Sequence, residues 1–134
     1  MGLEIKGMDG AVLTFEKLAQ DAEARAKKAV KAGAQHLRRA LETRLNNQNV
    51  SGRSTGELAK SIKADTVKYD SQNGYSAKVH PDGSDSRGEP FGLIGNVLEY
   101  GRSGGKGCYP WMQPTVDAES AAVNRIMEET FKKG

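Results

Sequence analysis

The chain has 134 residues, which predicts one domain covering residues 1–134, and its single cysteine excludes a disulfide within the chain. Hydrophobic residues make up 37% of the chain and aromatic residues only 6%, so we expect other copies or partner proteins to supply part of its packing. The net charge of +3 is too small to indicate nucleic-acid binding by itself, and no apolar run approaches the about 18 residues that a membrane-spanning helix needs.

The N-terminal third is predicted to hold a short strand and two helices. Residues 3–6 alternate between apolar and charged side chains, as in a short edge strand. Asp9 is a suitable N-cap for a first helix over residues 11–18, and a long helix is predicted over residues 21–45. Positions three or four apart form one stripe that is rich in small residues, so another backbone can approach closely: Phe15, Leu18, Ala22, Ala26, Ala29, Gly33, Leu37 and Ala40.

The face of the long helix opposite this stripe is basic. Lys27, Lys31 and Arg38 lie within about 40° of one another at about 100° per residue. Residues 21–45 contain seven Lys or Arg and three Asp or Glu. This pattern is typical of a solvated face, and the alternative is a surface turned toward an anion such as DNA or toward an acidic partner protein.

The middle of the chain predicts a short helix followed by a β-hairpin. Ser54 and Glu57 have the spacing of a capping box at a helix start, and Leu58 and Ile62 should be buried together. Two alternating strands are predicted over residues 66–70 and 75–80, and the dipeptide at positions 73 and 74 is Asn-Gly, a strong signal for a tight hairpin turn. The side chains expected to face inward are Val67, Tyr69, Tyr75, Ala77 and Val79.

The C-terminal part predicts a short element and a final helix. Phe91, Ile94 and Leu98 are spaced as in a helix, although Gly95 leaves a strand open. The last helix is expected to begin at Pro114, with an inner face formed by Met112, Val116, Ser120, Val123, Met127 and Phe131. The fold class is therefore α+β, with a long N-terminal and a C-terminal helix packed on a small antiparallel sheet that has a central hairpin.

Residues 97–101 and 109–114 are the candidate functional segments, joined by a glycine-rich stretch. The second segment contains the only tryptophan between two prolines, a rigid aromatic anchor typical of a docking surface and also of a buried connection. Glu99 lies among apolar neighbours and is expected to pair with an arginine or with backbone donors, within the fold or across subunits. The interface candidates are Glu99, Tyr100, Arg102, Tyr109, Trp111 and Met112.

The sequence holds no arrangement that predicts catalysis. Neither His36 nor His80 has a partner at metal-ligand spacing, and no carboxylates are spaced to hold a metal. Cys108 would need a nearby base to act as a nucleophile, and the glycines before it lack the complete phosphate-loop motif. We therefore expect no catalytic residue, no metal and no cofactor, and a protein that is not an enzyme.

Four motifs, in this order along the chain, resemble those of the neck or tail-component proteins of long-tailed double-stranded-DNA bacteriophages, including tail-completion proteins. They are residues 3–9 (LEIKGMD), 54–62 (STGELAKSI), 97–101 (VLEYG) and 109–114 (YPWMQP). The last three are similar to the family's Thr-Gly-x-Leu-x-x-Ser-Ile, Val-Glu-aromatic-Gly and Pro-aromatic-x-x-Pro patterns. The chain departs from the family at Arg102, where a threonine is frequent.

The resemblance implies a structural protein of the virion neck or tail. Such a protein assembles in the host cytoplasm as a homo-oligomeric ring, and its partners are the head-closure or connector protein and the tail-tube or tail-terminator protein. Double-stranded DNA passes through the ring, and no membrane is involved. The alternative is a small basic nucleic-acid-binding module that uses the helix face of residues 21–45, although no aromatic residues are interleaved with its basic ones.

Overall fold

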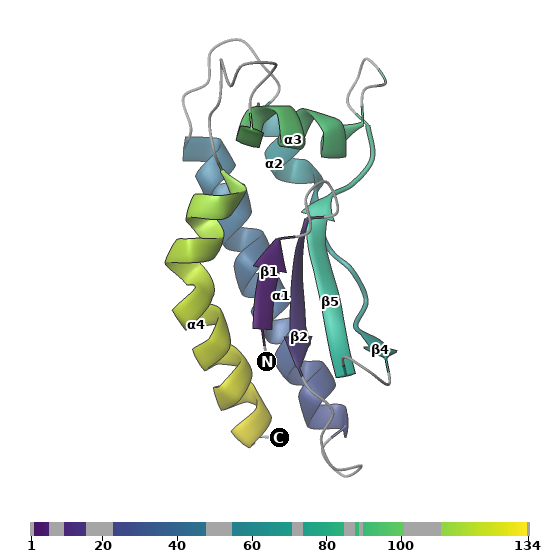
Figure 1. The fold of residues 1–134 in the computed structure, drawn as a ribbon, viewed down its shortest axis with the longest axis vertical. Coiled ribbons are helices and arrows are strands. Elements are labelled where there is room, and N and C mark those ends of the chain that lie inside the picture. Colours follow the sequence, from purple (N-terminus) through teal and green to yellow (C-terminus); the bar gives the residue numbers. More distant parts are fainter. Residues whose placement is uncertain are drawn as a thin grey trace.

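The computed structural model describes residues 2–5, 10–15, 23–47, 55–70, 74–84, 88, 90–100 and 111–133. Within these residues, four helices and one antiparallel sheet form an α+β fold, which confirms the predicted fold class (Figure 1). The strands are β1 (Gly2–Ile5), β2 (Ala11–Phe15), β3 (Ile62–Ala64), β4 (Lys68–Asp70) and β5 (Gly74–Pro81). The helices are α1 (Glu23–Asn47), α2 (Thr55–Ser61), α3 (Phe91–Tyr100) and α4 (Met112–Lys133).

The sheet has the order β1-β2-β5-β3, and β4 continues along the same edge of β5 as β3. Ala64 pairs with Val79 and Lys68 pairs with Ser76, so three residues, 65–67, oppose only two residues on β5. This extra residue is a β-bulge. The Asp65 amide donates to the Lys78 carbonyl at 2.8 Å, which holds the bulge to the sheet.

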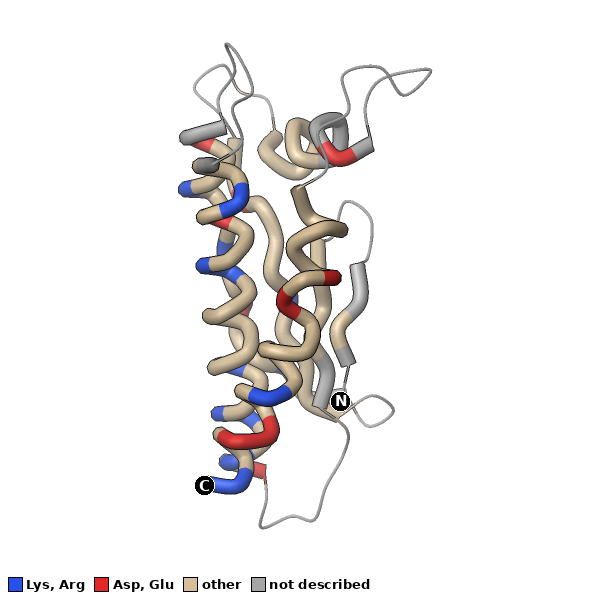
Figure 2. Tube along the Cα trace, turned by 90° about the vertical axis from the view of Figure 1, so that its left-hand side faces the viewer, with Lys and Arg blue, Asp and Glu red and all other residues tan. Residues whose placement is uncertain are grey.

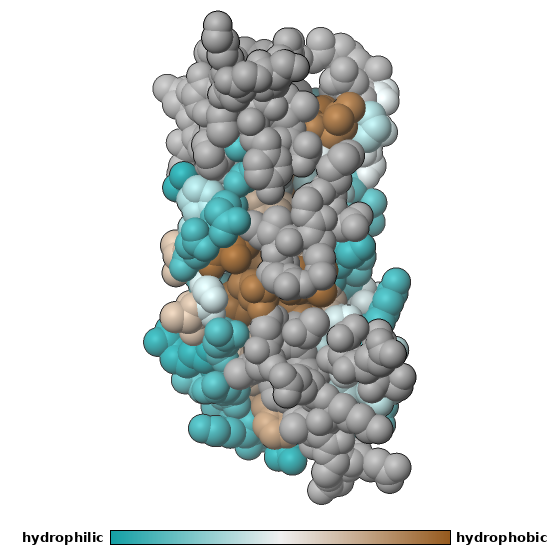
Figure 3. Space-filling model, viewed as in Figure 1, coloured by the Kyte–Doolittle hydropathy of each residue, from teal (hydrophilic) through white to brown (hydrophobic). Residues whose placement is uncertain are grey.

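One face of the sheet is covered by α1, and α4 packs along α1 and beside β1 (Figure 1). Side chains alternate along the strands, so Leu13 and Ala77 are buried under α1 while Val12 and Lys78 lie half-buried on the other face. Figure 3 shows that other face, with a hydrophobic area near its centre and hydrophilic side chains on both flanks.

The predicted helix over residues 11–18 is wrong for residues 11–15, which form β2. Ala11 pairs with Val79 and Leu13 with Ala77, so the segment fills the place between β1 and β5. Gly10 has a φ of 92° and its backbone lies so close to β5 that an added Cβ would be 2.3 Å from the Val79 carbonyl oxygen. Pairing on both sides of the strand therefore outweighs the local helical spacing. The proposed cap Asp9 and residues 16–18 lie outside the described residues.

The predicted pairing of the two hairpin strands is confirmed, but one side chain that was expected to be buried is exposed. β4 and β5 are antiparallel, and Gly74 has the positive φ of 82° that the turn requires. Tyr75, Ala77 and Val79 are buried as expected, whereas Tyr69 is 48% exposed. Its ring lies 5.0 Å from the Tyr75 ring at the free edge of the sheet, where α1 covers the inner tyrosine and leaves the outer one open.

The core lies between α1, α4 and the sheet. The small-residue stripe of α1 is confirmed at Ala26, Ala29, Gly33 and Leu37. A Cβ on Gly33 would be 2.8 Å from Met127 Cγ of α4 and 3.1 Å from Leu13 Cδ2 of β2, so three elements meet at this glycine. Further buried residues of α1 widen the stripe: Val30, Ala34, Leu41 and Leu45.

The remaining helices match their sequence patterns closely. Residues 91–100 form α3, so the helical interpretation of this segment is the correct one. Helix α4 begins at Met112, two residues before the predicted start, because the Glu99 side chain caps it there. Its predicted inner face is buried at Met112, Val116, Val123 and Met127 and half-buried at Ser120 and Phe131.

Candidate functional site

The Glu99 carboxylate joins the end of α3 to the start of α4. Its Oε1 accepts hydrogen bonds from the amides of Trp111 at 2.7 Å and Met112 at 2.6 Å, and its Oε2 accepts one from Gln113 at 3.0 Å. The first amides of a helix have no partner within the helix, and the helix dipole favours a negative charge at that end. Glu99 is only 6% exposed, so it stabilises the junction from the interior, as one of the alternatives predicted.

Trp111 fills the space beneath α3. The side chain is 1% exposed, and its Nε1 donates to the Gly95 carbonyl at 2.9 Å. A Cβ at Gly95 would lie 2.9 Å from Trp111 Cζ2, so the glycine lets the indole ring lie directly against the helix. The Thr115 hydroxyl donates to the Trp111 carbonyl at 2.6 Å and so fixes the first turn of α4.

The structure therefore brings three of the six interface candidates together in the interior of the chain. Glu99, Trp111 and Met112 are all buried and form one anchored junction. The backbone of Tyr100 ends α3, and its side chain, Arg102 and Tyr109 lie outside the described residues. A partner contact by these last three residues stays a prediction.

Lys and Arg residues recur along α1 (Figure 2). The three sequence candidates differ in their surroundings, because Lys27 lies 3.6 Å from Glu23 and Arg38 lies 2.9 Å from Glu42 on the same helix. Lys31 is exposed. The charges of Lys27 and Arg38 are thus partly balanced by the helix that carries them, which reduces their attraction for an external anion.

A groove of about 430 Å³ lies between the first half of α1 and the bulged edge of the sheet. We call it the lysine groove; it is lined by Lys27, Lys28, Lys31, Ala34, Gln35, Ala64, Asp65, Thr66 and Val67. Asp65 Oδ1 lies 2.8 Å from His80 Nε2, and His80 Nδ1 lies 2.8 Å from the Pro81 carbonyl oxygen. The acidic side chain at the groove is therefore already paired.

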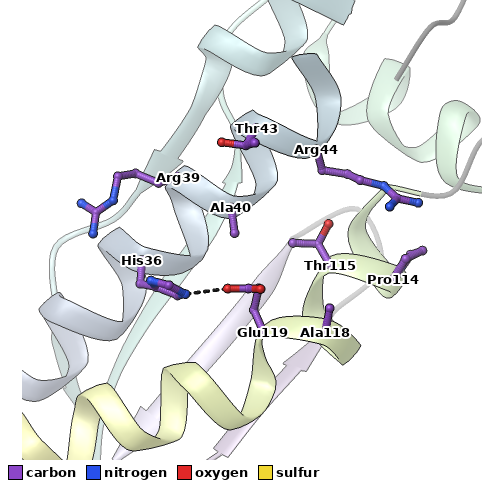
Figure 4. A pocket seen from close by; sticks show the side chains of 9 residues that line it. All are labelled: His36, Arg39, Ala40, Thr43, Arg44, Pro114, Thr115, Ala118 and Glu119. Atoms are coloured by element: carbon purple, nitrogen blue, oxygen red, sulfur yellow. Dashed lines mark hydrogen bonds and ion pairs between the residues drawn. The ribbon is translucent and has the colours of Figure 1, made fainter. Parts of the chain in front are cut away.

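A second groove, of about 460 Å³, separates the other half of α1 from the start of α4 (Figure 4). It is lined by His36, Arg39, Ala40, Thr43, Arg44, Pro114, Thr115, Ala118 and Glu119. His36 Nε2 lies 2.6 Å from Glu119 Oε1, so this pair links the two helices at one end of the groove. Its lining combines small side chains with cations and hydroxyls, which suits contact with a protein surface.

Neither histidine–carboxylate pair was predicted from the sequence. His36 and Glu119 are 83 residues apart, and His80 and Asp65 are 15 apart, so neither pair produces a local spacing. Among the described residues, no three or more His, Cys, Asp or Glu side chains gather where they could hold a metal ion. No helix in the described part of the chain is long and apolar enough to span a membrane.

Comparison with known protein families gives a match over residues 11–101 to the family described as "Bacteriophage HK97-gp10, putative tail-component". The chain belongs to this phage tail-component family. No significant match was found among curated proteins or among solved structures. The match runs from β2 through α3, and it contains the two central motifs of the resemblance at residues 54–62 and 97–101.

Membership of the phage tail-component family confirms the family resemblance and supports a structural, tail-related role. Residues 3–9 and 109–114 lie outside the matched range. The Glu99 junction nevertheless connects the match to the helix that follows it, because residue 99 lies inside the matched range and its three hydrogen-bond donors lie beyond it.

Proposed function

We propose that this tail component forms a homo-oligomeric ring in the phage neck, between the head connector and the tail tube, through which the DNA passes. Its partners would be other copies of the chain, the head-closure or connector protein, and the tail-tube or tail-terminator protein. It would be found in the virion and, during assembly, in the host cytoplasm. The observation that carries the proposal is the family match over residues 11–101.

A ring subunit needs two different contact surfaces, since each copy touches two neighbours through unlike patches. Two grooves with different linings flank α1 and offer such surfaces. The role that we propose is structural and involves no catalysis. The buried Glu99 junction supports this role because it fixes the end of α3 to the start of α4, which holds the two helices in position for contacts with other proteins.

Residues 100–110 are our candidates for contact with a neighbouring virion protein. The two residues that flank this segment, Glu99 and Trp111, are hydrogen-bonded to each other and buried. Anchored ends reduce the entropy that a binding segment loses on association. We therefore propose that Tyr100, Arg102 and Tyr109 contact the partner while Glu99, Trp111 and Met112 hold them in position.

The decisive experiment removes the gene from the phage that encodes the chain. We expect DNA-filled heads and separate tails in electron micrographs, and restoration of joined particles when the gene is supplied on a plasmid. The triple substitution Tyr100→Ala, Arg102→Ala, Tyr109→Ala should fold normally and fail to restore joining. Normal, infectious particles in the absence of the gene would contradict the proposal.

A nucleic-acid-binding module is the second candidate, because Figure 2 shows Lys and Arg along the whole of α1. Two of its three aligned charges, Lys27 and Arg38, already have carboxylate partners. A protein that neutralises six or more phosphates loses roughly 10³-fold or more in affinity between about 50 and 200 mM salt. We expect no measurable binding of the isolated chain to DNA or RNA at physiological salt.

The control for this expectation is the triple reversal Lys27→Glu, Lys31→Glu, Arg38→Glu, which should leave the fold intact and affect assembly at most. Fluorescence anisotropy with duplex and single-stranded probes measures the affinity. Tight binding by the wild-type chain that the triple reversal abolishes would favour the nucleic-acid module over the neck ring.

A further inference from the structure

The lysine groove has features that a solvated helix face does not need. Lys28 and Lys31 are exposed, and neither forms an ion pair with another residue in the described part of the chain. They lie beside three apolar side chains, Ala34, Ala64 and Val67, which form part of the groove lining. Lysines without an ion pair, next to apolar side chains, are suited to bind a segment that has both carboxylates and apolar surface.

An exposed aromatic ring extends this surface along β4. Tyr69 is one of only two large apolar residues that are exposed among the described residues, and it is two positions beyond Val67 on the same strand edge. Its partner across the sheet is Tyr75, which is buried under α1, so Tyr69 lies on the α1 side of the sheet together with the groove. Exposed tyrosines beside cations are typical of protein interfaces.

The composition of the groove favours a protein occupant over a phosphate backbone. Of its three lysines, Lys27 is paired with Glu23, which leaves two lysines with no ion pair to another described residue of the same copy. Asp65 adds a carboxylate to the lining. Binding of a DNA duplex rests on many cations that contact successive phosphates, and two cations supply little of that attraction.

The matching carboxylates are on α4. Glu128 and Glu129 are exposed, directly follow the buried Met127, and form no ion pair with another described residue. Helix α4 packs beside β1 at one edge of the sheet (Figure 1). The lysine groove lies at the opposite edge, beside the end of β3 and the bulge that follows it. The two charged patches therefore lie on opposite sides of the molecule.

Both patches also lie at the same end of the long axis. The Arg25 guanidinium near the start of α1 is 4.7 Å from the centre of the Phe131 ring near the end of α4. Lys28 and Lys31 follow Arg25 by about one to two helical turns, and Glu128 precedes Phe131 by about one turn. Translation of one copy sideways past another would thus bring the glutamates to the level of the groove.

We propose that Glu128 and Glu129 of one copy bind in the lysine groove of the next copy, with Tyr69 packing against the incoming helix. The contact joins two different surfaces, so its repetition closes a ring when the rotation between copies allows it. This inference rests on the proposed ring function and names the subunit contact within it.

Charge reversal tests the contact on the full-length chain. The variants Lys28→Glu/Lys31→Glu and Glu128→Lys/Glu129→Lys should each weaken self-assembly by about tenfold or more, because like charges then face each other. An equimolar mixture of the two variants should assemble again, since each lysine-bearing patch can meet a glutamate-bearing patch on the other variant. Native mass spectrometry of the mixture should show complexes in which the two variants alternate.

The control is Lys60→Glu/Lys63→Glu, which makes the same change in net charge at two exposed lysines outside the groove. It should assemble like the wild type, and circular dichroism should show the same fold for all variants. A second measurement uses two chains that both carry Cys108→Ser, so that neither has its native cysteine. One chain carries Lys31→Cys and the other carries Glu128→Cys. Cross-links should form between the two chains and be absent when either cysteine is missing.

Each other outcome overturns the inference in a distinguishable way. If the wild type assembles but the charge reversals do not weaken assembly, or their mixture does not restore it, then the proposed contact is wrong while the ring function stands. If the wild type stays monomeric at every concentration, a second copy does not occupy the groove, and the gene-removal experiment then decides the neck role separately. If duplex DNA binds the wild type and Lys28→Glu/Lys31→Glu abolishes that binding, phosphate occupies the groove instead.

Discussion

At the scale of single residues, the most informative side chain is Glu99, because its carboxylate accepts hydrogen bonds from the amide that precedes α4 and from the first two amides of α4. Glu99→Ala should lower the free energy of unfolding by about 2–3 kcal/mol, the amount typical for hydrogen bonds to a buried charge. Glu99→Gln keeps the shape and one acceptor oxygen and should cost roughly half as much. Urea unfolding followed by circular dichroism measures both values.

The matched control for Glu99 is Asp117→Asn, which removes the charge of an exposed carboxylate in the first turns of α4, the helix that Glu99 caps. This change should alter the free energy of unfolding by no more than about 0.5 kcal/mol. Equal stability of Glu99→Ala and the wild type would show that water or another group replaces the carboxylate at the helix start.

Tyr75 provides a residue-scale prediction for alkaline pH. Burial raises the pKa of the Tyr75 phenol above its usual value of 10.0, and a hydrogen bond with Glu23 and the charge of that carboxylate raise it further. Below pH 10 the phenol is neutral in both the folded and the unfolded chain, so its contribution is constant. Above that pH the unfolded chain ionises first, and the folded state loses stability.

The comparison with Tyr75→Phe isolates this effect, because lysines titrate in the same range in both proteins. The free energy of unfolding of the wild type relative to that of Tyr75→Phe should stay constant up to about pH 9 and fall as the pH rises beyond about 10. A difference that stays constant over this range would mean that the phenol ionises equally in the folded and unfolded chains.

At the scale of elements, the contact of α1 with α4 depends on the missing side chain at Gly33. An added Cβ would lie 2.8 Å from Met127 Cγ, and Met127 is fully buried. Gly33→Ala should therefore destabilise the wild type by about 1–2 kcal/mol, the overpacking cost less the gain in helix propensity. In a Met127→Ala background the same change should be neutral or stabilising, because the crowding is removed.

A double-mutant cycle in urea measures this coupling between the two helices. The control is Lys28→Ala, at an exposed position of α1. Its effect on the free energy of unfolding should add independently to that of Met127→Ala. If Gly33→Ala had the same effect in both backgrounds, the close approach of α1 and α4 at this glycine would not be the source of the cost.

At the scale of the whole molecule, the chain is lean in aromatic and hydrophobic residues and exposes Tyr69 beside the lysine groove. If other copies supply part of its packing, association stabilises the folded state by mass action, and the Tm rises with protein concentration. Differential scanning calorimetry over about a hundredfold range of concentration should show a shift of several degrees. A constant Tm would contradict stabilisation by self-association.

The sequence by itself determined the elements whose evidence is local. The small-residue stripe of α1, the inner face of α4 and the alternation along β5 repeat every two to four residues, so a short window contains the whole signal. The motifs at residues 54–62 and 97–101 are also local, and both lie inside the range that matches the phage tail-component family. Glu99 was also recognisable, as a carboxylate among apolar neighbours.

Only the tertiary structure decided which of these residues meet. The segment 11–15 is a strand because it pairs with both β1 and β5, and its Val12, Thr14 and Phe15 were a weak local sign of this. Trp111 is a core residue because Gly95, 16 positions earlier, leaves room for its ring. The pairs His36–Glu119 and His80–Asp65 and both grooves likewise join distant parts of the chain. Packing of whole elements sets such contacts, and no spacing along the sequence records them.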